Sequence, residues 1–243
     1  LGGEVYLNQK AILHGDDLVV QDINGRNAKK HIAQVQIGDM FIEPSQVVWT
    51  GPITQAGRQL GSPTTKLKYL GLLLFNVMVK EEAPRDYQWC YYGSKKLLIN
   101  RVSVPRFFSP DTAPQGTGGY CCEVTCMKGD SRWEHAERLT DWVIDDLVKV
   151  NMIRNRANVI DARVERLEDS YPIYQKDYPG QLDLARQQLS QFENFQLAGR
   201  TGLFWYNNMD HSIENAMQLC KRLLRDAGRV DTQELALAAG QSA

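Results

Sequence analysis

The sequence GRTGLFWYNNMDHSIENAM, residues 199–217, decides how this chain is interpreted. It follows a short apolar segment, residues 195–198, that is expected to form a strand, and it continues into a segment with helical periodicity. The first turn of a helix has unpaired N–H groups and the positive end of the macrodipole, so such a helix start binds anionic or electron-rich groups. Gly199 and Gly202 allow a close approach of the backbone. The stretch therefore predicts a binding site, and a capped helix with its aromatic rings in the core is the alternative.

Side chains within this stretch fit either interpretation. Asn207, Asn208 and Asp210 can each cap a helix or bond to a ligand. The three aromatic residues at positions 204–206 offer flat apolar surface for a ring. For His211, in the expected first turn, a capping or solvated role is preferred over a contact with ligand.

Helices are expected on both sides of the stretch. One lies around residues 180–191, and a final helix runs to about Ala227. Apolar residues recur in this final helix at helical spacing, at Ile213, Met217, Cys220 and Leu224. The polar tail at residues 233–243 is expected to fray.

The middle of the chain predicts a mostly antiparallel sheet with helices packed on it. The expected strands are residues 67–79, 88–92, 97–104 and 120–126, and a further strand covers residues 159–167. A helix is expected to begin at Ser131, because Ser131 and Glu134 have the spacing of a capping box. Trp133 and Val143 fall on its apolar side and are expected to face the sheet.

The first 60 residues are expected to form mainly strands. Strands are expected at residues 5–7, 11–13, 18–20 and 45–50, with a hairpin turn at Asn24-Gly25 and a helix at about 52–60. Residues 5–7 and 195–198 are expected to lie close together as strands of one sheet.

Composition excludes several classes of function. The 243 residues include 28 Lys and Arg against 29 Asp and Glu, so no basic excess indicates nucleic-acid binding. The longest apolar run, residues 69–79, is too short to span a bilayer.

Neither the histidines nor the cysteines have metal-ligand spacing, so no metal is expected. An odd number of cysteines, with no export signal at the start, favours a cytoplasmic location. The cysteines are Cys90, Cys121, Cys122, Cys126 and Cys220.

Five segments carry a resemblance to a known family. The segments YPIY (171–174) and GQLDLARQQLSQFENFQLAGRTGLFWYNNMDHSI (180–213) resemble the C-terminal part of the flavin-containing amine oxidase-like superfamily. Within it, the similarity is to protoporphyrinogen oxidase-like and UDP-galactopyranose mutase-like proteins. GGEVYLNQKAI (2–12), NRVSVPRFFSPDTAP (100–114) and CCEVTCMKGDSRWEH (121–135) resemble other segments of the same superfamily.

The resemblance implies an α+β fold with a specific division into domains. Residues 1–62 and 176–230 would be parts of an FAD-binding, Rossmann-like domain, residues 63–175 the substrate-binding domain, and residues 231–243 a flexible tail. The family's N-terminal GxGxxG unit, which binds the FAD pyrophosphate, has no match in this sequence. The chain therefore resembles the C-terminal half of such a protein, and we expect it to hold FAD weakly or not at all by itself.

The resemblance also implies residues that bind the cofactor. The backbone of Ala11 and Ile12 would bond to adenine. Gly199 and Arg200 would end a strand beside the flavin. At a helix start near the isoalloxazine and ribityl groups would lie Asn208, Met209 and Asp210. Unpaired N–H groups at that helix start would stabilise the negative charge of a reduced flavin at N1 and O2.

The resemblance further implies residues that contact a small-molecule substrate. Arg101, with Arg200, would bind an anionic group of the substrate, although an ordinary ion pair is the more common role of such an arginine. Phe204 and Tyr206 would contact the substrate with their rings. No catalytic side chain is identified, because in this family the flavin carries out the chemistry.

Three functions remain open from the sequence. The leading one is an FAD-dependent oxidoreductase in which the flavin accepts a hydride. The second is a sugar-nucleotide mutase, but these enzymes have Tyr-Tyr-Asp-Met where this chain has Tyr-Asn-Asn-Met at positions 206–209, and Tyr in place of Phe204. The loss of the carboxylate at Asn208 speaks against mutase activity. The third is a non-catalytic binding domain.

Overall fold

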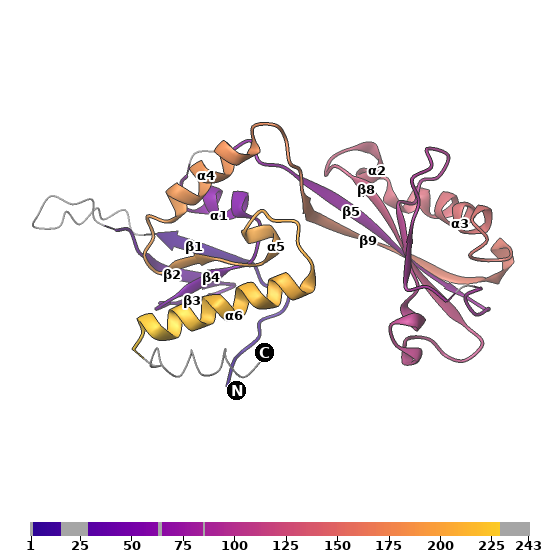
Figure 1. Ribbon diagram of the computed structural model, residues 1–243, viewed down its shortest axis with the longest axis horizontal. Helices are drawn as coiled ribbons and strands as arrows, with labels where there is room; N and C mark the ends of the chain where they lie inside the picture. Colours follow the sequence, from indigo (N-terminus) through magenta and orange to yellow (C-terminus); the bar gives the residue numbers. More distant parts are fainter. Residues whose placement is uncertain (1, 16–28, 63–64, 85, 229–243) are drawn as a thin grey trace, which may run out of the picture. The chain divides into compact units, whose positions relative to one another are not determined.

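The computed structural model describes residues 2–15, 29–62, 65–84 and 86–228 (Figure 1). The expected strand at residues 18–20, the turn at Asn24-Gly25 and the tail at 233–243 lie outside these residues. The chain divides into two compact units, each described by itself below. The first unit comprises Leu1–Leu67 and Tyr174–Ala243, and the second unit comprises Lys68–Ile173.

The second unit is built on a five-stranded antiparallel sheet, as the sequence predicts. The strand order is β6-β7-β8-β5-β9. The strands are β5 (Tyr69–Val79), β6 (Trp89–Tyr91), β7 (Arg101–Ser103), β8 (Gly118–Cys126) and β9 (Val159–Pro172). Short 3₁₀ turns lie between them at η1 (Pro105–Phe107), η2 (Pro110–Thr112) and η4 (Arg156–Asn158).

The strand expected at residues 97–104 is shorter in the structure. Only Arg101–Ser103 forms a strand, because the preceding backbone bonds to a helix instead of a neighbouring strand. The carboxylate of Asp146 accepts hydrogen bonds from the N–H groups of Leu98 at 2.5 Å and Ile99 at 3.4 Å. Because Asp146 is buried, these bonds tie the loop firmly to the helix that carries it.

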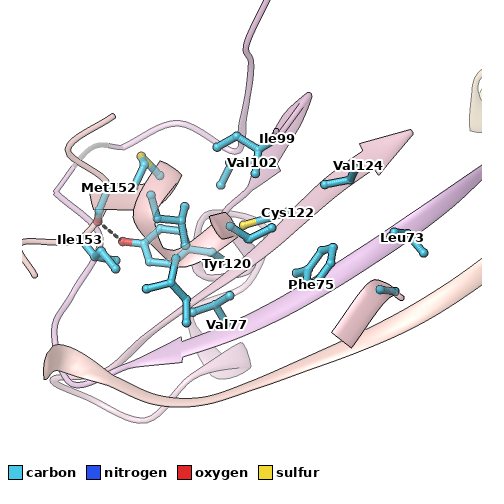
Figure 2. Packing of buried hydrophobic residues seen from close by; sticks show 14 of the residues in the cluster. Leu73, Phe75, Val77, Ile99, Val102, Tyr120, Cys122, Val124, Met152 and Ile153 are labelled. Carbon is cyan, nitrogen blue, oxygen red and sulfur yellow. Dashed lines mark hydrogen bonds between the residues drawn. The ribbon is translucent and has the colours of Figure 1, made fainter. Parts of the chain in front are cut away.

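One face of this sheet forms the core of the second unit (Figure 2). Alternate residues of the central strand β5 point to this face, and they are fully buried against side chains of β7, β8 and the helices. Tyr120 lies among them and donates its hydroxyl hydrogen to the Met152 carbonyl at 2.6 Å. Each such apolar side chain contributes about 1.5–3 kcal/mol when fully buried. The labelled members of the cluster are Leu73, Phe75, Val77, Ile99, Val102, Tyr120, Cys122, Val124, Met152 and Ile153.

The helix expected from Ser131 is interrupted, and its cap is a different residue. The segment forms α2 (Ser131–Glu134), η3 (Ala136–Leu139) and α3 (Thr140–Lys149). Asp130 is the N-cap and accepts the Trp133 N–H at 2.9 Å, so the prediction of a Ser131 capping box is wrong. The Trp133 carbonyl accepts a bond from Arg166 Nε at 3.0 Å, which takes an acceptor that a continuous helix would use.

Trp133 and Val143 are both buried, as predicted. The Trp133 ring lies against Gly71 of β5, where an added Cβ atom would approach it to 2.8 Å. The sequence therefore predicts the buried side of this segment correctly, although the segment is not one helix.

The first unit contains two small sheets. The strands β1 (Ala11–Gly15), β2 (Ile32–Ile37) and β3 (Met40–Ile42) form an antiparallel sheet, and β4 (Val47–Trp49) and β10 (Phe195–Leu197) form a parallel pair. The helices α1 (Ile53–Gln59) and α4 (Tyr178–Leu189) lie on one side of the strands (Figure 1). The helix α6 (Met209–Asp226) lies on the other side and follows the short α5 (Gly199–Gly202).

The predicted partner of residues 195–198 is wrong. Residues 5–7 form no strand and are exposed, and β10 instead pairs with β4. Hydrogen bonds at both ends fix the pair, from Val47 N–H to the Asn194 carbonyl at 2.7 Å and from Ala198 N–H to the Trp49 carbonyl at 3.0 Å. The strand of residues 45–50 was thus predicted correctly, but its position beside β10 was not.

The apolar residues that reveal α6 in the sequence do not form its buried face. Ile213, Met217, Cys220 and Leu224 are exposed, whereas Leu219 is buried. Among the described residues, no helix is long and apolar enough to cross a membrane, and no cluster of three metal-ligating side chains occurs.

Candidate functional site

The candidate site lies where the two parallel strands of the first unit end. The register Phe195↔Val47 to Leu197↔Trp49 places the carboxyl ends of β4 and β10 at the same edge. The β4 strand continues through Thr50 and Gly51 to α1, and β10 continues through Ala198 to α5. Ligands of α/β folds bind at this edge, because loops and helix starts converge there. We call the residues Thr50, Gly51 and Gly199–Asp210 the strand-end site.

Two glycines allow the backbone segments of the strand-end site to touch. A Cβ atom on Gly202 would lie 2.7 Å from the Trp49 carbonyl oxygen, so no side chain fits there. Gly199 has a φ of +70°, which favours glycine. Thr201 Oγ1 donates to the Thr50 carbonyl at 2.7 Å and fastens the two segments together. The close approach expected from these glycines is therefore present, and at Gly202 it is made to β4.

Arg200 folds the loop after α5 back onto the strand end. Its guanidinium donates to the Asn207 carbonyl and lies over the Tyr206 ring, 4.9 Å from the ring centroid. The Arg200 carbonyl accepts the Trp205 N–H at 2.9 Å. Arg200 therefore organises the loop around its own side chain. Its expected contact with a flavin or an anionic substrate stays a prediction.

The three aromatic residues of the loop have different surroundings. Phe204 is 1% exposed and packs edge-on against Tyr174, with ring centroids 6.0 Å apart. Its φ of +52° is unusual for a residue with a side chain, and this packing holds it in place. Trp205 and Tyr206 are exposed and present ring surface at the site. Phe204 thus supports the loop, and the expected substrate contacts of Phe204 and Tyr206 stay predictions.

The structure adds a residue to the site that sequence reasoning missed. The Tyr174 hydroxyl accepts the Tyr206 N–H at 2.7 Å and so joins the loop to the segment that precedes α4. Tyr174 belongs to the YPIY segment, whose two aromatic residues were the available signal. Thr50 was missed as well, because its carbonyl, and not its side chain, makes the contact.

The start of α6 lies where the sequence places it. Asn208 is the N-cap, and its N–H donates to His211 Nδ1 at 3.5 Å in a capping box. The capping role preferred for His211 is therefore confirmed. Met209 and Asp210 begin the helix, so their N–H groups have no partner in the preceding turn, and Met209 is 81% exposed.

Asn207 contributes a buried donor beside this helix start. The side chain is almost fully buried, and its Oδ1 accepts the Ser212 hydroxyl hydrogen at 3.1 Å. Its Nδ2 is buried as well and has no hydrogen-bond partner within the part of the chain that the structure describes. A buried amide donor of this kind is costly unless another group accepts from it.

Ala11 and Ile12 lie on β1, an edge strand in the other sheet of the first unit. The Ala11 carbonyl accepts a bond from Gln59 Nε2 at 3.3 Å, and Gln59 Oε1 accepts the Leu13 N–H at 2.8 Å. Gln59, on α1, thus occupies the outer edge of β1 much as a neighbouring strand would. Contacts of Ala11 and Ile12 with adenine stay predictions.

Arg101 lies in the second unit, apart in the sequence from the strand-end site. Its guanidinium pairs with the buried carboxylate of Glu123 and donates to the Tyr91 hydroxyl at 3.4 Å. Burial opposes the charge of Arg101, but the hydrogen bond to Tyr91 and the charge of Glu123 raise its pKa above the usual value. The ion-pair role is therefore present, and binding of an anionic substrate group by Arg101 stays a prediction.

Comparison with known proteins identifies the fold. No family model matches the chain, and no curated protein matches its sequence. The structure of reduced UDP-galactopyranose mutase matches 74% of this chain with a TM-score of 0.63 and 19% identity, and the match covers 41% of that protein. A protein from Exiguobacterium sp. 255-15, assigned provisionally as a protoporphyrinogen oxidase, matches 82% of this chain with a TM-score of 0.61 and 15% identity, over 44% of its own length.

These matches show that the chain shares its α+β fold with a part of each of these two structures, as the resemblance in the sequence implied. The chain spans less than half of the length of either matched protein.

Proposed function

We propose that this chain is part of an FAD-dependent oxidoreductase and that the strand-end site faces the flavin. The observation that carries the proposal is the junction of a parallel strand end with a helix start at Met209, beside the unpartnered buried Nδ2 of Asn207. Helix N–H groups and a buried amide donor together suit a planar group with several acceptor atoms. The fold shared with the two matched proteins supports the same class.

The residues present fit such a cofactor. Gly199 and Gly202 keep the strand end free of side chains, and the exposed rings of Trp205 and Tyr206 supply apolar surface. The N–H groups of Met209 and Asp210 would stabilise negative charge on the pyrimidine side of the flavin. No titrating side chain is required for this. When bound, FAD supplies the hydride acceptor, and the chain binds, orients and shields the substrate.

The two units take different roles in this proposal. The first unit would be part of an FAD-binding, Rossmann-like domain that lacks its GxGxxG segment, and the second unit would bind the substrate. Arg101 would contribute to the substrate side through its guanidinium, which already pairs with Glu123 and donates to the Tyr91 hydroxyl.

A sugar-nucleotide mutase is the second candidate, and the fold match to reduced UDP-galactopyranose mutase favours it. Asn208 argues against it, because those enzymes have Asp at this position of the motif and the carboxylate is lost here. The two candidates differ in electron balance. An oxidoreductase bleaches its flavin with substrate and needs an acceptor to recover, whereas a mutase converts a UDP-sugar with no net consumption of an acceptor.

A substitution at the helix start tests the proposal. Met209→Pro removes one N–H at the first helical position, where proline is sterically tolerated, and Met209→Ala is the matched control that keeps the N–H. In the complete flavoprotein, Met209→Pro is expected to lower the flavin midpoint potential by about 30 mV, equivalent to about 1.4 kcal/mol for a two-electron couple. Met209→Ala is expected to leave the potential unchanged.

Spectroelectrochemical titration of both variants measures this difference. Equal midpoint potentials for the two variants would show that the flavin does not lie at the helix start. Purified residues 1–243 are expected to show little or no flavin absorbance, and stoichiometric FAD retained by this chain alone would contradict the proposed division of the site. A complete protein that binds no flavin would leave the third candidate, a non-catalytic binding domain.

A further inference from the structure

The strand β6 lies at one edge of the five-stranded sheet of the second unit and carries exposed aromatic side chains. Its middle residue, Cys90, is the register partner of the buried Val102, so Trp89 and Tyr91 point to the face of the sheet opposite the core. The Phe108 ring stacks on Trp89, with centroids 5.9 Å apart and 14° between the ring planes. The three rings are 48–63% exposed, and we call them the β6 aromatic patch.

The outer edge of β6 has none of the usual protection of an edge strand. Proteins protect such edges with charged residues, proline or bulges, because unpaired main-chain groups bind other strands. The three residues of β6 include no charge and no proline, and their pairing with β7 is regular. The ladder continues at both ends, where the Val104 N–H donates to the Gln88 carbonyl and the Tyr92 N–H to the Asn100 carbonyl, each at 2.8 Å. The extended edge is therefore longer than β6 itself.

These hydrogen bonds fix which main-chain groups of β6 point outward. In an antiparallel ladder, alternate residues bond to the same neighbour. Because Gln88 and Tyr92 bond to β7, Cys90 does so too, and the N–H and C=O groups of Trp89 and Tyr91 are directed away from it. Among the described residues, no strand pairs with β6 on that outer side. The free donors and acceptors thus belong to the two residues of the strand that also carry exposed rings.

This pattern is self-complementary. If β6 of a second copy runs antiparallel across a two-fold axis at Cys90, Trp89 of each copy lies opposite Tyr91 of the other. Both residues have outward main-chain groups, so each pair exchanges two hydrogen bonds and the free groups of β6 are all satisfied. A shift by two residues would leave half of these groups without a partner in the strand. The opposed rings of Trp89 and Tyr91 also form a favourable cross-strand pair.

The charges beside β6 favour an antiparallel neighbour. Asp86 is exposed before the strand, and Lys95 and Lys96 are exposed after it. An antiparallel second copy brings Asp86 of each chain toward Lys95 of the other, whereas a parallel neighbour of the same sequence would align like charges. A second copy of this chain therefore fits the edge in both hydrogen bonding and charge.

We propose that the second unit forms a two-fold symmetric dimer through its β6 strands, so that one sheet continues across two copies of the chain. A fully buried aromatic side chain covers about 150–250 Å², so the half-exposed rings of the β6 aromatic patch offer about 300 Å² per copy. A standard interface takes about 800 Å² per partner, and the dimer is therefore weak. No flavin takes part, so the proposal is independent of the proposed function. Because Tyr91 accepts a bond from Arg101, the interface borders the Arg101–Glu123 pair.

Cys90 reports on the register of this dimer. At the two-fold axis the two Cys90 residues form a non-hydrogen-bonded pair, whose Cα atoms lie about 4.5 Å apart. Disulfides span Cα separations of about 4.4–6.8 Å. The Cys90 thiol donates to the Tyr91 carbonyl at 3.7 Å and so lies beside the outer edge. Copper phenanthroline with oxygen would take two electrons and two protons from this pair of thiols and join the copies, whereas random collisions would join the more exposed Cys220.

Sedimentation velocity of residues 1–243 and of the complete protein, between about 1 and about 300 µM, measures the association. We expect a concentration-dependent dimer in both, and a Cys90–Cys90 peptide as the main oxidised product in mass spectrometry. Trp89→Glu should weaken the association at least about tenfold, because it places a charge at the aromatic pair. The matched control is Ile160→Glu, which should change it less than about twofold, since Ile160 is 50% exposed on β9 at the opposite edge of the sheet.

Other results overturn the proposal. A monomer at every concentration would show that β6 does not pair with a second copy. A dimer that Trp89→Glu leaves intact, or whose disulfides form through Cys220, would place the contact elsewhere. A complete protein that stays monomeric with Cys90 unreactive, while residues 1–243 dimerise, would assign the β6 edge to another segment of the complete protein.

Discussion

The two units of the chain bury their apolar side chains to different degrees. The second unit places a continuous set of residues from β5, β7 and β8 against its own helices, and the cluster includes no residue from the first unit. Among its described residues, the first unit has two small sheets, one of them the parallel pair of β4 and β10, and a long helix, α6, whose residues Ile213, Met217 and Leu224 are exposed.

This difference separates a closed core from open surfaces within one chain. The second unit has the closed core that an independently stable fold requires, whereas the first unit keeps open the surfaces at which strand ends and helix starts meet. Substitutions in the two units should therefore differ in what they cost, and the predictions below compare them in order of decreasing effect.

The largest effect is expected in the core of the second unit. Phe75→Ala removes a fully buried ring from β5 and should destabilise the protein by about 3–5 kcal/mol. Phe41→Ala is the control in the first unit, because Phe41 is exposed on β3 and should cost less than about 1 kcal/mol. Urea unfolding of both variants measures the difference. Similar costs would mean that the two units do not differ in packing.

A smaller effect is expected at the strand-end site. Gly202→Ala places a Cβ atom 2.7 Å from the Trp49 carbonyl oxygen, and the resulting shift should cost about 1–3 kcal/mol. Gly180→Ala, in α4, meets open space and should stabilise the helix by about 0.5–1 kcal/mol. The melting temperatures of the two variants should therefore shift in opposite directions. A neutral Gly202→Ala would show that the contact between α5 and β4 is loose.

The cap of α2 distinguishes the sequence expectation from the structure. Asp130→Ala should destabilise the second unit by about 1 kcal/mol, because the Trp133 N–H loses its acceptor. Ser131→Ala should have little effect, since Ser131 is the first helical residue and not the cap. The denaturant midpoints of the two variants show which residue caps α2. A larger loss of stability for Ser131→Ala would support the capping box that the sequence predicts.

The smallest effect is a pH dependence at the surface of the second unit. A bidentate pair with Arg166, at 2.8 and 2.9 Å, lowers the pKa of Glu137 from 4.5 to about 2. Because the pKa is lowered in the folded state, the pair stabilises the protein above about pH 4.5 and loses this contribution as the pH falls toward 2. Glu137→Gln should flatten the fall in melting temperature between pH 5 and 3 slightly. An unchanged slope would show that the pair adds nothing to stability.

Local patterns in the sequence predict much of the fold. The strand β5 follows from its long apolar run. The start of α6 follows from Asn208 and His211, because a cap depends on residues within one turn. The buried side of the α2–α3 segment follows from the spacing of Trp133 and Val143.

Long-range contacts decide what the sequence could not predict. The break after α2 depends on Arg166, which reaches the Trp133 carbonyl from a distant strand. The pairing of β10 with β4 joins segments that no local pattern connects. Helical spacing locates α6 but does not give the face that the helix buries, which carries Leu219. The engagement of Arg200 with Asn207 and Tyr206 depends on a loop that folds back on itself.

The point where the second unit joins the first also has an evolutionary consequence. Lys68 and Ile173 are its first and last residues, and the Ile173 N–H donates to the Lys68 carbonyl at 2.9 Å. The chain therefore leaves and re-enters the first unit at adjacent residues, as an inserted module does. Exchange of the stretch between these two residues for another would keep the ends of the flanking segments together. The second unit could be replaced in this way without a change to the fold of the first unit.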